Sequence, residues 1–579
     1  MSIEIHTLWD LVVRNLLRPD RPEALGNYQG GDPVWTGSHE LFVSSVSLCQ
    51  GLFEQIRKGE PIGLMGLPCP DWIAIDLAIQ GAGGISVPLF PNTSPDILKR
   101  QVQKAELKRI FLLESISEEQ AKQLQDLIVY TQESVLLPEI PQRQPFPKGI
   151  HPLTLESAIK WASHRANDLA SNQRATIIFT SGSTGEPKGA PLTHNNLVSQ
   201  IHGATERFPM GTKDRAISFL PLAHVFERMV TYTYLAQGVN ILFVHQPKVL
   251  PRAMKDFSPT IMTAVPRLLE KVYRTISSRA EAKSGLPRDL ARWALHLALT
   301  HHTDAPKPHL AWFGADVLAF GKMRDALGGK LKMLIVGGAP LKKSLARFFT
   351  NIGVPTYQGY GLTECSPVLA ANSPDSDRPG SVGTAFPGVH IRIDLLNNEV
   401  IAKGPGVFDG YLDGDRGCID EHDWFHTGDR GRIDDDGYLF ITGRIKERMK
   451  TSNGKYISPA PIEQEICLHP WIDQAMVVAE SRPYVTALLC PDPDQFPQTL
   501  TQTLEETPEH HLSPHQMEDF QKHLNKVNAK LNPWERVQKV QWLPSPFTVE
   551  SGELTPTLKV RRHIVLKKYL DLIEALYNT

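Results

Sequence analysis

Residues 175–197 read ATIIFTSGSTGEPKGAPLTHNNL. The run Ala175–Phe179 is short, apolar and β-branched, which predicts a buried strand. A loop follows from Thr180 to Gly189, and its glycines can adopt backbone angles closed to other residues and leave N–H groups bare. Its four hydroxyls are hydrogen-bond donors, and Lys188 adds a positive charge. We expect Thr193 or Asn195 to cap a helix that follows. Strand, donor-rich loop, lysine and helix together predict a polyphosphate site.

A flexible surface turn has a similar composition, and most loops rich in Gly, Ser and Thr bind no ligand. Phosphate binding is favoured here because the loop directly follows a buried strand and carries a lysine. The loop is not a Walker A motif. Counted from Gly182, the second glycine of that motif falls on Pro187, and Gly189 stands where Ser or Thr is required. The sequence therefore disfavours a P-loop NTPase and indicates a different nucleotide chemistry.

The composition narrows the class of protein. The 61 Lys and Arg nearly balance the 63 Asp and Glu, which gives no electrostatic case for nucleic acid. Six scattered cysteines without a C-x-x-C pair disfavour a disulfide framework or zinc site and favour a reducing, cytoplasmic setting. Glu4 and Asp10 interrupt the place where an export signal needs an apolar core. The most apolar window, Trp72 to Phe90, contains Asp76 and is interpreted as a helix and a strand, not a membrane span.

The order of elements predicts an α/β fold. Apolar runs near residues 61–66, 85–89 and 109–113 alternate with helical patterns, which indicates a parallel sheet with helices on its faces. Residues 275–320 look helical and polar, as in an insertion. From Gly380 to Tyr438, short strands and Gly, Pro and Asp-Gly turns predict a small β subdomain. The charged stretch from Arg444 to Lys455 is a predicted hinge, followed by a mixed α/β region of domain size.

Three further motifs complete the pattern: Tyr360-Gly361-Leu362-Thr363-Glu364, Thr427-Gly428-Asp429 and Gly443-Arg444. With them, nearly the whole chain resembles the adenylate-forming superfamily of acyl-CoA synthetases, firefly-type luciferases and peptide-synthetase adenylation domains, in the family's order and spacing. The stretches SFLPLAHVFER (218–228), VPR (265–267) and LTPTLK (554–559) are similar to the long-chain fatty acid–CoA ligase branch.

The resemblance implies a fold and an activity. The expected fold is a large N-terminal domain, residues 1–443, of αβαβα-type subdomains plus a small distorted β-barrel. A smaller mobile α+β domain, residues 444–579, would rotate about a hinge near 444–447. The implied enzyme is an acid–thiol ligase that uses ATP and Mg²⁺ to convert a fatty acid into acyl-AMP. It then transfers the acyl group to the co-substrate CoA, giving acyl-CoA, AMP and pyrophosphate.

The chemistry requires positive charge and aimed donors, because a carboxylate must approach a polyanionic triphosphate. By resemblance, the phosphates are bound by Thr180, Ser181, Gly182, Ser183, Thr184, Gly185 and Lys188. Tyr360, beside Gly361 and Thr363, would lie against the adenine, with the backbone of Gly338 and Ala339 on the other side.

Further residues complete the implied site. Asp429 and Arg444 would hold the ribose hydroxyls, and Lys446 would be the pivot of the hinge. Glu364, with Thr184, would hold Mg²⁺, a hard ion that prefers oxygen ligands.

The catalytic residues implied by the resemblance are Lys559, His224 and Thr184. Lys559 is a compact cation that could bridge the acyl carboxylate and the α-phosphate as charge develops there. The alternative is a surface lysine in a basic tail, since Arg561 and Arg562 are close by. His224 would flank the carboxylate pocket, although a lone histidine is more often structural.

Other interpretations remain open. Acyl carrier protein could replace CoA as the acceptor, or the chain could be a non-catalytic homologue that binds acyl groups or nucleotides. His422 and His426 have a spacing that could bind metal, but their Gly/Asp-rich surroundings favour a non-metal role. The basic, amphipathic tail from Lys559 to Tyr577 would allow peripheral contact of a cytoplasmic protein with a membrane, although a docked surface helix is favoured.

Overall fold

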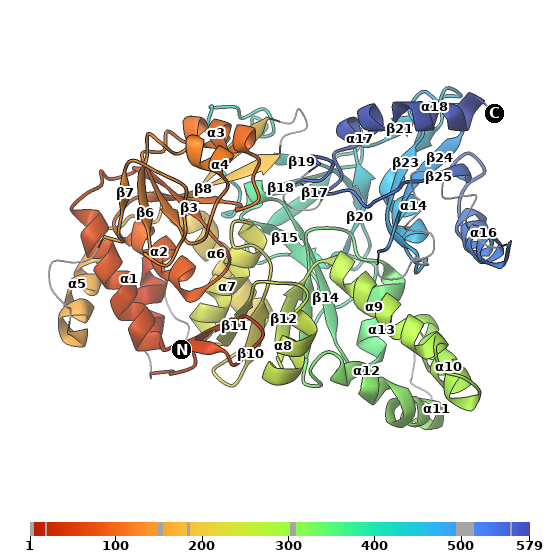
Figure 1. Cartoon of the computed structure of the whole chain (residues 1–579), viewed down its shortest axis with the longest axis horizontal. Coiled ribbons are helices and arrows are strands. Elements are labelled where there is room, and N and C mark those ends of the chain that lie inside the picture. The colour runs from red at the N-terminus through yellow and green to blue at the C-terminus, as the bar shows by residue number, and fades with distance from the viewer. Residues whose placement is uncertain are drawn as a thin grey trace.

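The computed structural model describes residues 5–17, 20–147, 154–181, 186–301, 309–493, 514–549, 551–555 and 559–578. Within these ranges the main body of the molecule is built on two large sheets, and a four-stranded and a three-stranded sheet follow along the chain. In Figure 1 the first large sheet lies at the left, and the three-stranded sheet of the C-terminal part lies at the upper right.

The first large sheet covers residues 61–193. Its strands, in spatial order, are β7 (Arg143–Gln144), β6 (Ile128–Thr131), β5 (Arg109–Leu112), β3 (Pro61–Met65), β4 (Ile85–Leu89), β8 (Arg174–Ser181) and β9 (Pro187–Thr193). The pairs from β7 to β8 are all parallel. The predicted parallel sheet is therefore confirmed.

Helices cover both faces of this sheet. Ile62 and Leu64 share an apolar cluster with α1 (Ser38–Phe53), α2 (Pro70–Gly81) and α5 (Leu155–Asn167). Val87 and Leu89 belong to another cluster with α3 (Pro95–Lys104) and α4 (Glu118–Lys122). Strands buried on both faces read as continuous apolar runs, which is why these segments were recognisable in the sequence.

The second large sheet gathers strand ends at one edge. In the described chain its order is β16 (Thr384–Ala385), β15 (Val368–Ala371), β14 (Thr356–Gly361), β13 (Met333–Val336), β12 (Ile261–Ala264), β10 (Arg215–Ser218), β11 (Asn240–Val244), β1 (Leu25–Tyr28) and β2 (Val34–Thr36). Strands β10, β12, β13 and β14 run parallel to one another, whereas β15 is antiparallel to β14. The carboxyl ends of parallel strands meet at one edge, where α/β proteins bind ligands.

A buried ion pair joins the two large sheets. Arg228, on helix α7 (Val225–Gln237), donates to Asp76 on α2, with Nη2–Oδ1 and Nε–Oδ2 distances of 2.7 and 2.9 Å. Its Nη1 also donates to the Thr176 hydroxyl of β8 at 2.7 Å, and Ser86 donates to Asp76 at 2.5 Å. Burial raises the pKa of Asp76, and the Arg228 charge opposes that rise. One guanidinium thus connects α2, α7 and β8.

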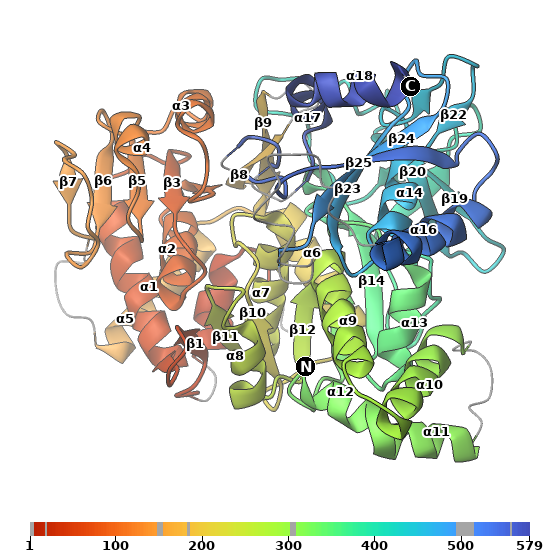
Figure 2. The same ribbon diagram turned by 45° about the vertical axis from the view of Figure 1, so that its right-hand side comes forward.

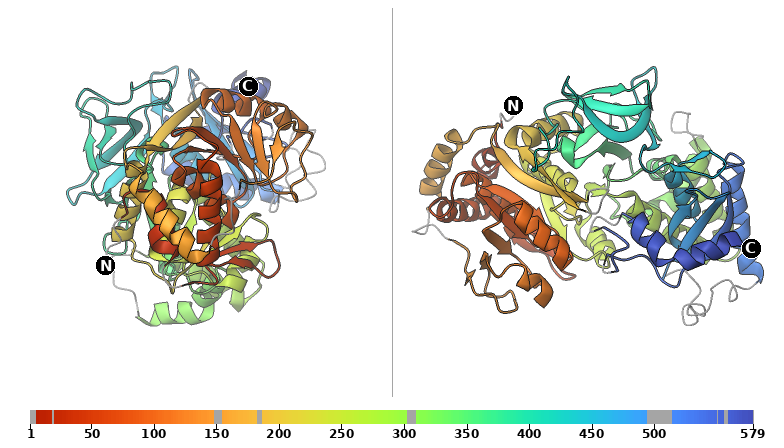
Figure 3. Two further views of the ribbon diagram at one scale, coloured as in Figure 1. Left: turned by 90° about the vertical axis from the view of Figure 1, so that its left-hand side faces the viewer. Right: turned by 90° about the horizontal axis from the view of Figure 1, so that it is seen from above.

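The predicted small β subdomain is confirmed. Strands β17 (His390–Ile393), β18 (Glu399–Lys403), β19 (Phe425–Ile433) and β20 (Leu439–Arg444) form an antiparallel sheet. Seen from above, this sheet and the blue C-terminal part occupy separate regions of the molecule (Figure 3).

The C-terminal part is a mixed α/β unit. Among the described residues it contains the short pair β21 (Met449–Lys450) and β22 (Tyr456–Ile457) and the sheet β23 (Ile472–Val478), β24 (Val485–Pro491) and β25 (Val537–Trp542). Its helices are α14 (Pro459–Ile466), α16 (Pro514–Ala529), α17 (Arg562–Lys568) and α18 (Leu570–Asn578). In the described chain, its two apolar clusters contain no residue before Met449. We call residues 446–578 the C-terminal unit.

The predicted extent of the phosphate loop, from Thr180 to Gly189, is wrong. Residues Pro187–Thr193 are strand β9, which pairs antiparallel with β8 through pairs such as Thr180↔Lys188, so both ends of the expected loop belong to a hairpin. The predicted cap is confirmed, because helix α6 (His194–Arg207) follows β9 and the Thr193 hydroxyl accepts from the Asn196 N–H at 3.1 Å. The phosphate loop therefore has no helix N-terminus directly behind it.

Two other segments match their predictions. The insertion consists of α9 (Pro266–Glu281), α10 (Leu286–Thr300), α11 (His309–Ala315), a π-helical turn (Asp316–Phe320) and α12 (Gly321–Asp325). In the tail, Ile573 and Leu576 of α18 are buried in the C-terminal unit, which fits a docked helix. None of the helices in the described ranges has both the length and the apolar composition of a membrane span. Peripheral membrane contact stays a prediction.

We expect Arg228→Ala to destabilise the protein by about 3–5 kcal/mol, because it leaves the Asp76 carboxylate buried and unpaired. Urea unfolding, followed by tryptophan fluorescence, should show the first transition at a lower urea concentration. The control is Arg292→Ala, which removes an exposed ion pair with Glu281 and should leave the transition nearly unchanged. Equal midpoints for the two variants would contradict the importance of the buried pair.

Candidate active site

A cavity of about 580 Å³ lies where the carboxyl ends of the second sheet meet the β8–β9 hairpin, the four-stranded sheet and the C-terminal unit. Its lining brings together eleven of the predicted site residues: Thr180, Lys188, His224, Gly338, Tyr360, Gly361, Thr363, Glu364, Arg444, Lys446 and Lys559. These residues span nearly 400 positions of the chain, so their meeting in one cavity is a property of the fold.

The remaining predicted residues stand as follows. Asp429 is buried behind the cavity wall, and Ala339 is exposed beside Gly338. Ser181 is the last residue of β8 and pairs with Pro187. Gly182, Ser183, Thr184 and Gly185 lie outside the described residues, so their predicted roles stay predictions.

Asp429 links two cavity residues. It stands opposite Arg444 across the β19–β20 pair, with 3.0 Å between Arg444 Nε and Asp429 Oδ1. The Tyr360 hydroxyl donates to Asp429 Oδ2 at 2.8 Å. Burial raises the pKa of Asp429, and the Arg444 charge opposes the rise, while burial and the nearby Asp429 raise the pKa of Tyr360. A carboxylate held between a phenol and a guanidinium can accept hydrogen bonds from paired hydroxyls.

The paired glycines after β13 permit close packing beside this corner. A Cβ atom on Gly337 would lie 3.0 Å from the ring of Phe226, so the ring would have to shift by a few tenths of an ångström. Gly338 has a φ of +82°, which favours glycine. The apolar start of α7 and the backbone of Gly338 therefore share one wall of the cavity.

The loop of residues 411–415 contacts the β8–β9 hairpin, which we call the phosphate hairpin after its predicted role. The Leu412 N–H donates to the Gly189 carbonyl at 2.8 Å, and Lys188 Nζ lies 2.9 Å from Asp415 Oδ2. The same ammonium lies 4.6 Å from the centre of the Tyr411 ring. The Tyr411 hydroxyl donates to Glu364 Oε1 at 2.7 Å and so orients that carboxylate.

Sequence reasoning missed Tyr411 and Asp415. They lie in the loop before β19, and Asp415 is 227 residues from its partner Lys188. No periodic pattern marks such residues, although a tyrosine between glycine- and aspartate-rich turns was a local signal for a loop near the site.

Glu364 has the chemistry of a magnesium ligand. It lies in the 3₁₀ turn Thr363–Cys365 and faces the cavity. Among the described residues, no three His, Cys, Asp or Glu side chains cluster as a metal cage. Mg²⁺ commonly binds through one or two carboxylates together with substrate phosphates and waters, so a single oriented glutamate beside the phosphate hairpin fits this ion.

His224 makes a structural contact and also lines the cavity, while its predicted place beside a substrate carboxylate stays a prediction. It caps helix α7, because its Nδ1 accepts from the Phe226 N–H at 3.2 Å, and it also lines the cavity. Burial lowers the pKa of His224 to about 4, and the Lys559 charge acts in the same direction. The imidazole is therefore neutral at pH 7.

Lys559 reaches the cavity from the C-terminal unit. The Thr555 N–H donates to the Lys559 carbonyl at 2.8 Å, and the Lys559 N–H donates to the Thr555 hydroxyl at 3.0 Å. Lys559 is exposed to solvent through the open cavity, yet the surrounding protein lowers the pKa of its ammonium by desolvation, and the Arg444 charge acts in the same direction. Asp429, Glu447 and Glu364 oppose it. The ammonium thus lies among the carboxylates of the site.

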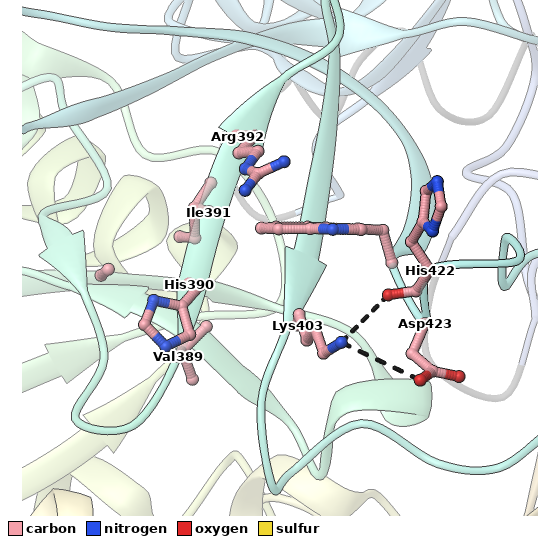
Figure 4. Close-up of a pocket in the computed structure, with 9 residues that line it drawn as sticks. Val389, His390, Ile391, Arg392, Lys403, His422 and Asp423 are labelled. Carbon is pink, nitrogen blue, oxygen red and sulfur yellow. Dashed lines mark hydrogen bonds and ion pairs between the residues drawn. The ribbon is translucent and has the colours of Figure 1, made fainter.

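A second, larger and more open hollow of about 920 Å³ lies on the four-stranded sheet (Figure 4). There Lys403 donates to the His422 carbonyl at 3.0 Å and lies 3.9 Å from Asp423, while the Arg392 guanidinium lies 4.1 Å from the Trp424 ring centre. His422 lines this hollow, whereas His426 lines the first cavity and contacts Glu399. The two histidines thus border different hollows, which supports the non-metal interpretation.

The geometry can be compared with known proteins. A model of the AMP-binding enzyme family matches residues 18–412, and one of the AMP-binding enzyme C-terminal domain matches residues 446–579. The chain belongs to the AMP-binding enzyme family. Long-chain-fatty-acid–CoA ligase FadD15 of Mycobacterium tuberculosis (strain ATCC 25618 / H37Rv) is 32% identical over 539 residues, covering 90% of this chain and 89% of that protein.

Two further matches extend the comparison. Long-chain-fatty-acid–CoA ligase 5 of Rattus norvegicus is 29% identical over 618 residues, which cover 99% of this chain and 89% of that protein. O-succinylbenzoate coenzyme A synthetase (MenE) from Bacillus subtilis, solved in complex with ATP and magnesium ion, aligns with a TM-score of 0.65 at 19% identity, over 96% of this chain and 98% of that one. The AMP-binding enzyme described here is thus an adenylate-forming ligase, and its family implies a carboxylic acid and CoA as substrates.

We expect Tyr411→Phe to raise the Mg²⁺ concentration needed for half-maximal pyrophosphate exchange by about 10–100-fold, because Glu364 loses the donor that orients it. The matched control is Tyr130→Phe, which removes a hydroxyl that donates to Gln55 in the first sheet, away from the cavity. An unchanged Mg²⁺ dependence in Tyr411→Phe would refute the orienting role.

Proposed function

We propose that the protein activates a long-chain fatty acid with ATP and transfers the acyl group to CoA. The observation that carries the proposal is the meeting of Lys559, Arg444 and Glu364 at one cavity, in a chain about 30% identical to proteins named long-chain-fatty-acid–CoA ligase. The acyl chain would lie along the apolar start of helix α7, whose residues from Val225 to Ala236 are buried, and near Val265 beside Gly338.

In the first step, a carboxylate oxygen attacks the α-phosphorus of ATP and pyrophosphate leaves. Lys188 and the donors of the hairpin tip would bind the phosphates, while Asp429 would accept from the ribose hydroxyls. Glu364 would hold Mg²⁺, which when bound neutralises phosphate charge. Lys559 would contact the carboxylate and the α-phosphate together, where negative charges must approach each other.

In the second step, the CoA thiolate attacks the acyl carbon and AMP leaves. Lys559 would then have no role, and the thiol needs a path to the cavity. We propose that the C-terminal unit rotates about residues 444–447 between the steps. Ile445 donates to the Gly428 carbonyl at 2.9 Å, which anchors the chain on the four-stranded sheet directly before Lys446. A few residues between an anchored strand and a separate unit are suited to a hinge.

An assay of AMP release tests the proposal. Acids from acetate to stearate are supplied with ATP and Mg²⁺, either alone, with CoA, or with holo acyl carrier protein. The expected result is fast turnover with long-chain acids and CoA. Turnover only with carrier protein would move the proposal to that acceptor, and absence of acid-dependent pyrophosphate exchange with every acid would favour a non-catalytic homologue.

Lys559→Ala is expected to slow acid-dependent pyrophosphate exchange by about 10²–10³-fold, because the charge that bridges the reacting anions is lost. Transfer from supplied acyl adenylate to CoA should remain near the native rate. The control is Lys567→Ala on the neighbouring helix α17. An equal loss of both half-reactions would exclude the proposed role.

Lys446→Pro restricts the backbone at the proposed hinge. It should impair thioester formation from supplied acyl adenylate and largely spare pyrophosphate exchange. Stopped-flow release of AMP measures the second step, with Lys446→Ala as the control that keeps the backbone free. A native rate of the second step in the proline variant would place the hinge elsewhere.

A further inference from the structure

Helix α9 connects the cavity with the C-terminal unit. It begins at Pro266, directly after Val265, whose side chain lies beside Gly338 of the cavity wall. In Figures 1 and 2 the helix lies below α14 and β23. Arg267, Glu270 and Arg274 are spaced i, i+3 and i+7 along it, so they share one helical face.

That face meets acidic groups of the C-terminal unit. Arg274 is buried, and its Nη1 donates to the Ile472 carbonyl at 2.8 Å and to Asp492 Oδ2 at 2.9 Å. Its Nη2 lies 3.8 Å from Asp473 Oδ1, and Arg267 also donates to Asp473. Ile472 starts β23 and Asp492 follows β24, so these two arginines bind one end of the C-terminal sheet.

A second group of contacts lies at the cap of α13 (Lys343–Asn351). Lys342 donates to the Gln464 carbonyl and lies 3.7 Å from Glu465, while Gln464 Nε2 donates to the Pro340 carbonyl at 3.3 Å. Burial lowers the pKa of Lys342 to about 8, against the opposing charges of Glu465 and Glu270. Pro340 follows the Gly338 and Ala339 pair, so this contact is also close to the cavity in sequence.

We propose that Arg267, Arg274 and Lys342 are positioning residues that hold the C-terminal unit in the orientation in which Lys559 faces the cavity. This inference rests on the proposed two-step function. Each of the three cations reaches across to a carboxylate or carbonyl of the C-terminal unit, and none of them lines the cavity. They affect the first step only by setting the position of Lys559 at the cavity.

Polar contacts suit an interface that opens in each turnover. Exposing an apolar interface costs free energy in proportion to its area, whereas separated charges regain hydration. Interfaces between units of one chain are commonly polar and allow relative motion. Weakening these ion pairs should therefore shift the population of orientations and leave each unit folded.

The test compares Arg267→Ala and Arg274→Gln with Arg292→Ala, whose ion pair with Glu281 joins α9 to α10 and includes no residue of the C-terminal unit. Dyes on exposed Glu133 and Lys526, introduced with non-natural amino acids, report the distance between the main body and the C-terminal unit by FRET. This distance measurement does not depend on enzyme activity. Failure of the inference about the positioning residues is therefore distinguishable from failure of the proposed function.

We expect both variants, but not the control, to populate other distances. Pyrophosphate exchange should fall by about tenfold, in proportion to the lost population, while transfer from supplied acyl adenylate stays at or above the native rate. Distance distributions equal to that of Arg292→Ala would overturn the proposal. An equal fall of both half-reactions with a lowered melting temperature would also overturn it, since that indicates a merely structural role. Arg267→Ala keeps the test decisive if the buried Arg274 variant does not fold, because Arg267 is partly exposed.

Discussion

The ion pair between Arg228 and Asp76 is the contact on which the geometry of the cavity depends. Helix α7 starts at the cavity with its cap His224, and one turn later Arg228 reaches into the other sheet. The same guanidinium bonds Thr176 on β8, the strand that continues into the phosphate hairpin. Removing a buried pair from water is costly, so such a pair adds little net stability, yet breaking it is expensive. Its effect here is to fix the position of the phosphate hairpin relative to His224, because one guanidinium contacts both supporting elements.

The ion pairs at the cavity are of two kinds, one with a buried carboxylate and one exposed to solvent. Asp429 is buried, opposite Arg444 and bonded to Tyr360, so separating it from both would leave a desolvated charge. The Lys188–Asp415 pair is different, because both side chains are substantially exposed, and exposed pairs contribute little. In the proposed function, a triphosphate would displace Asp415 from Lys188 at small cost, while Asp429, Arg444 and Tyr360 would keep their arrangement. The proposed site would thus combine a preformed part with a part that accepts an incoming polyanion.

Sequence patterns predicted the sheets and most of the cavity, for physical reasons that also explain the failures. Buried parallel strands are continuous apolar runs, and motifs such as Tyr360–Glu364 are specific in combination. The strand after the phosphate loop was missed because it holds two prolines and a glycine, residues with low strand propensity. Pairing with β8 overrides that propensity, and Pro187 is tolerated as the first residue of the strand. Tyr411 and Asp415 act through partners far away in the chain, and a single sequence carries no signal for such pairs.

The placement of α9 gives a reason why domain orientation and cavity chemistry can be coupled without a relay of moving side chains. The helix starts at the cavity wall, and Arg267 in its first turn and Arg274 near its middle hold the C-terminal sheet, so one rigid element contacts both. A movement of the C-terminal unit would therefore act on the position of α9. A ligand bound against the cavity wall near Val265 would act on the same helix. Since these contacts with the C-terminal unit are polar and Leu269 of the same helix is buried in an apolar cluster of the main body, the C-terminal unit can separate while the helix stays packed.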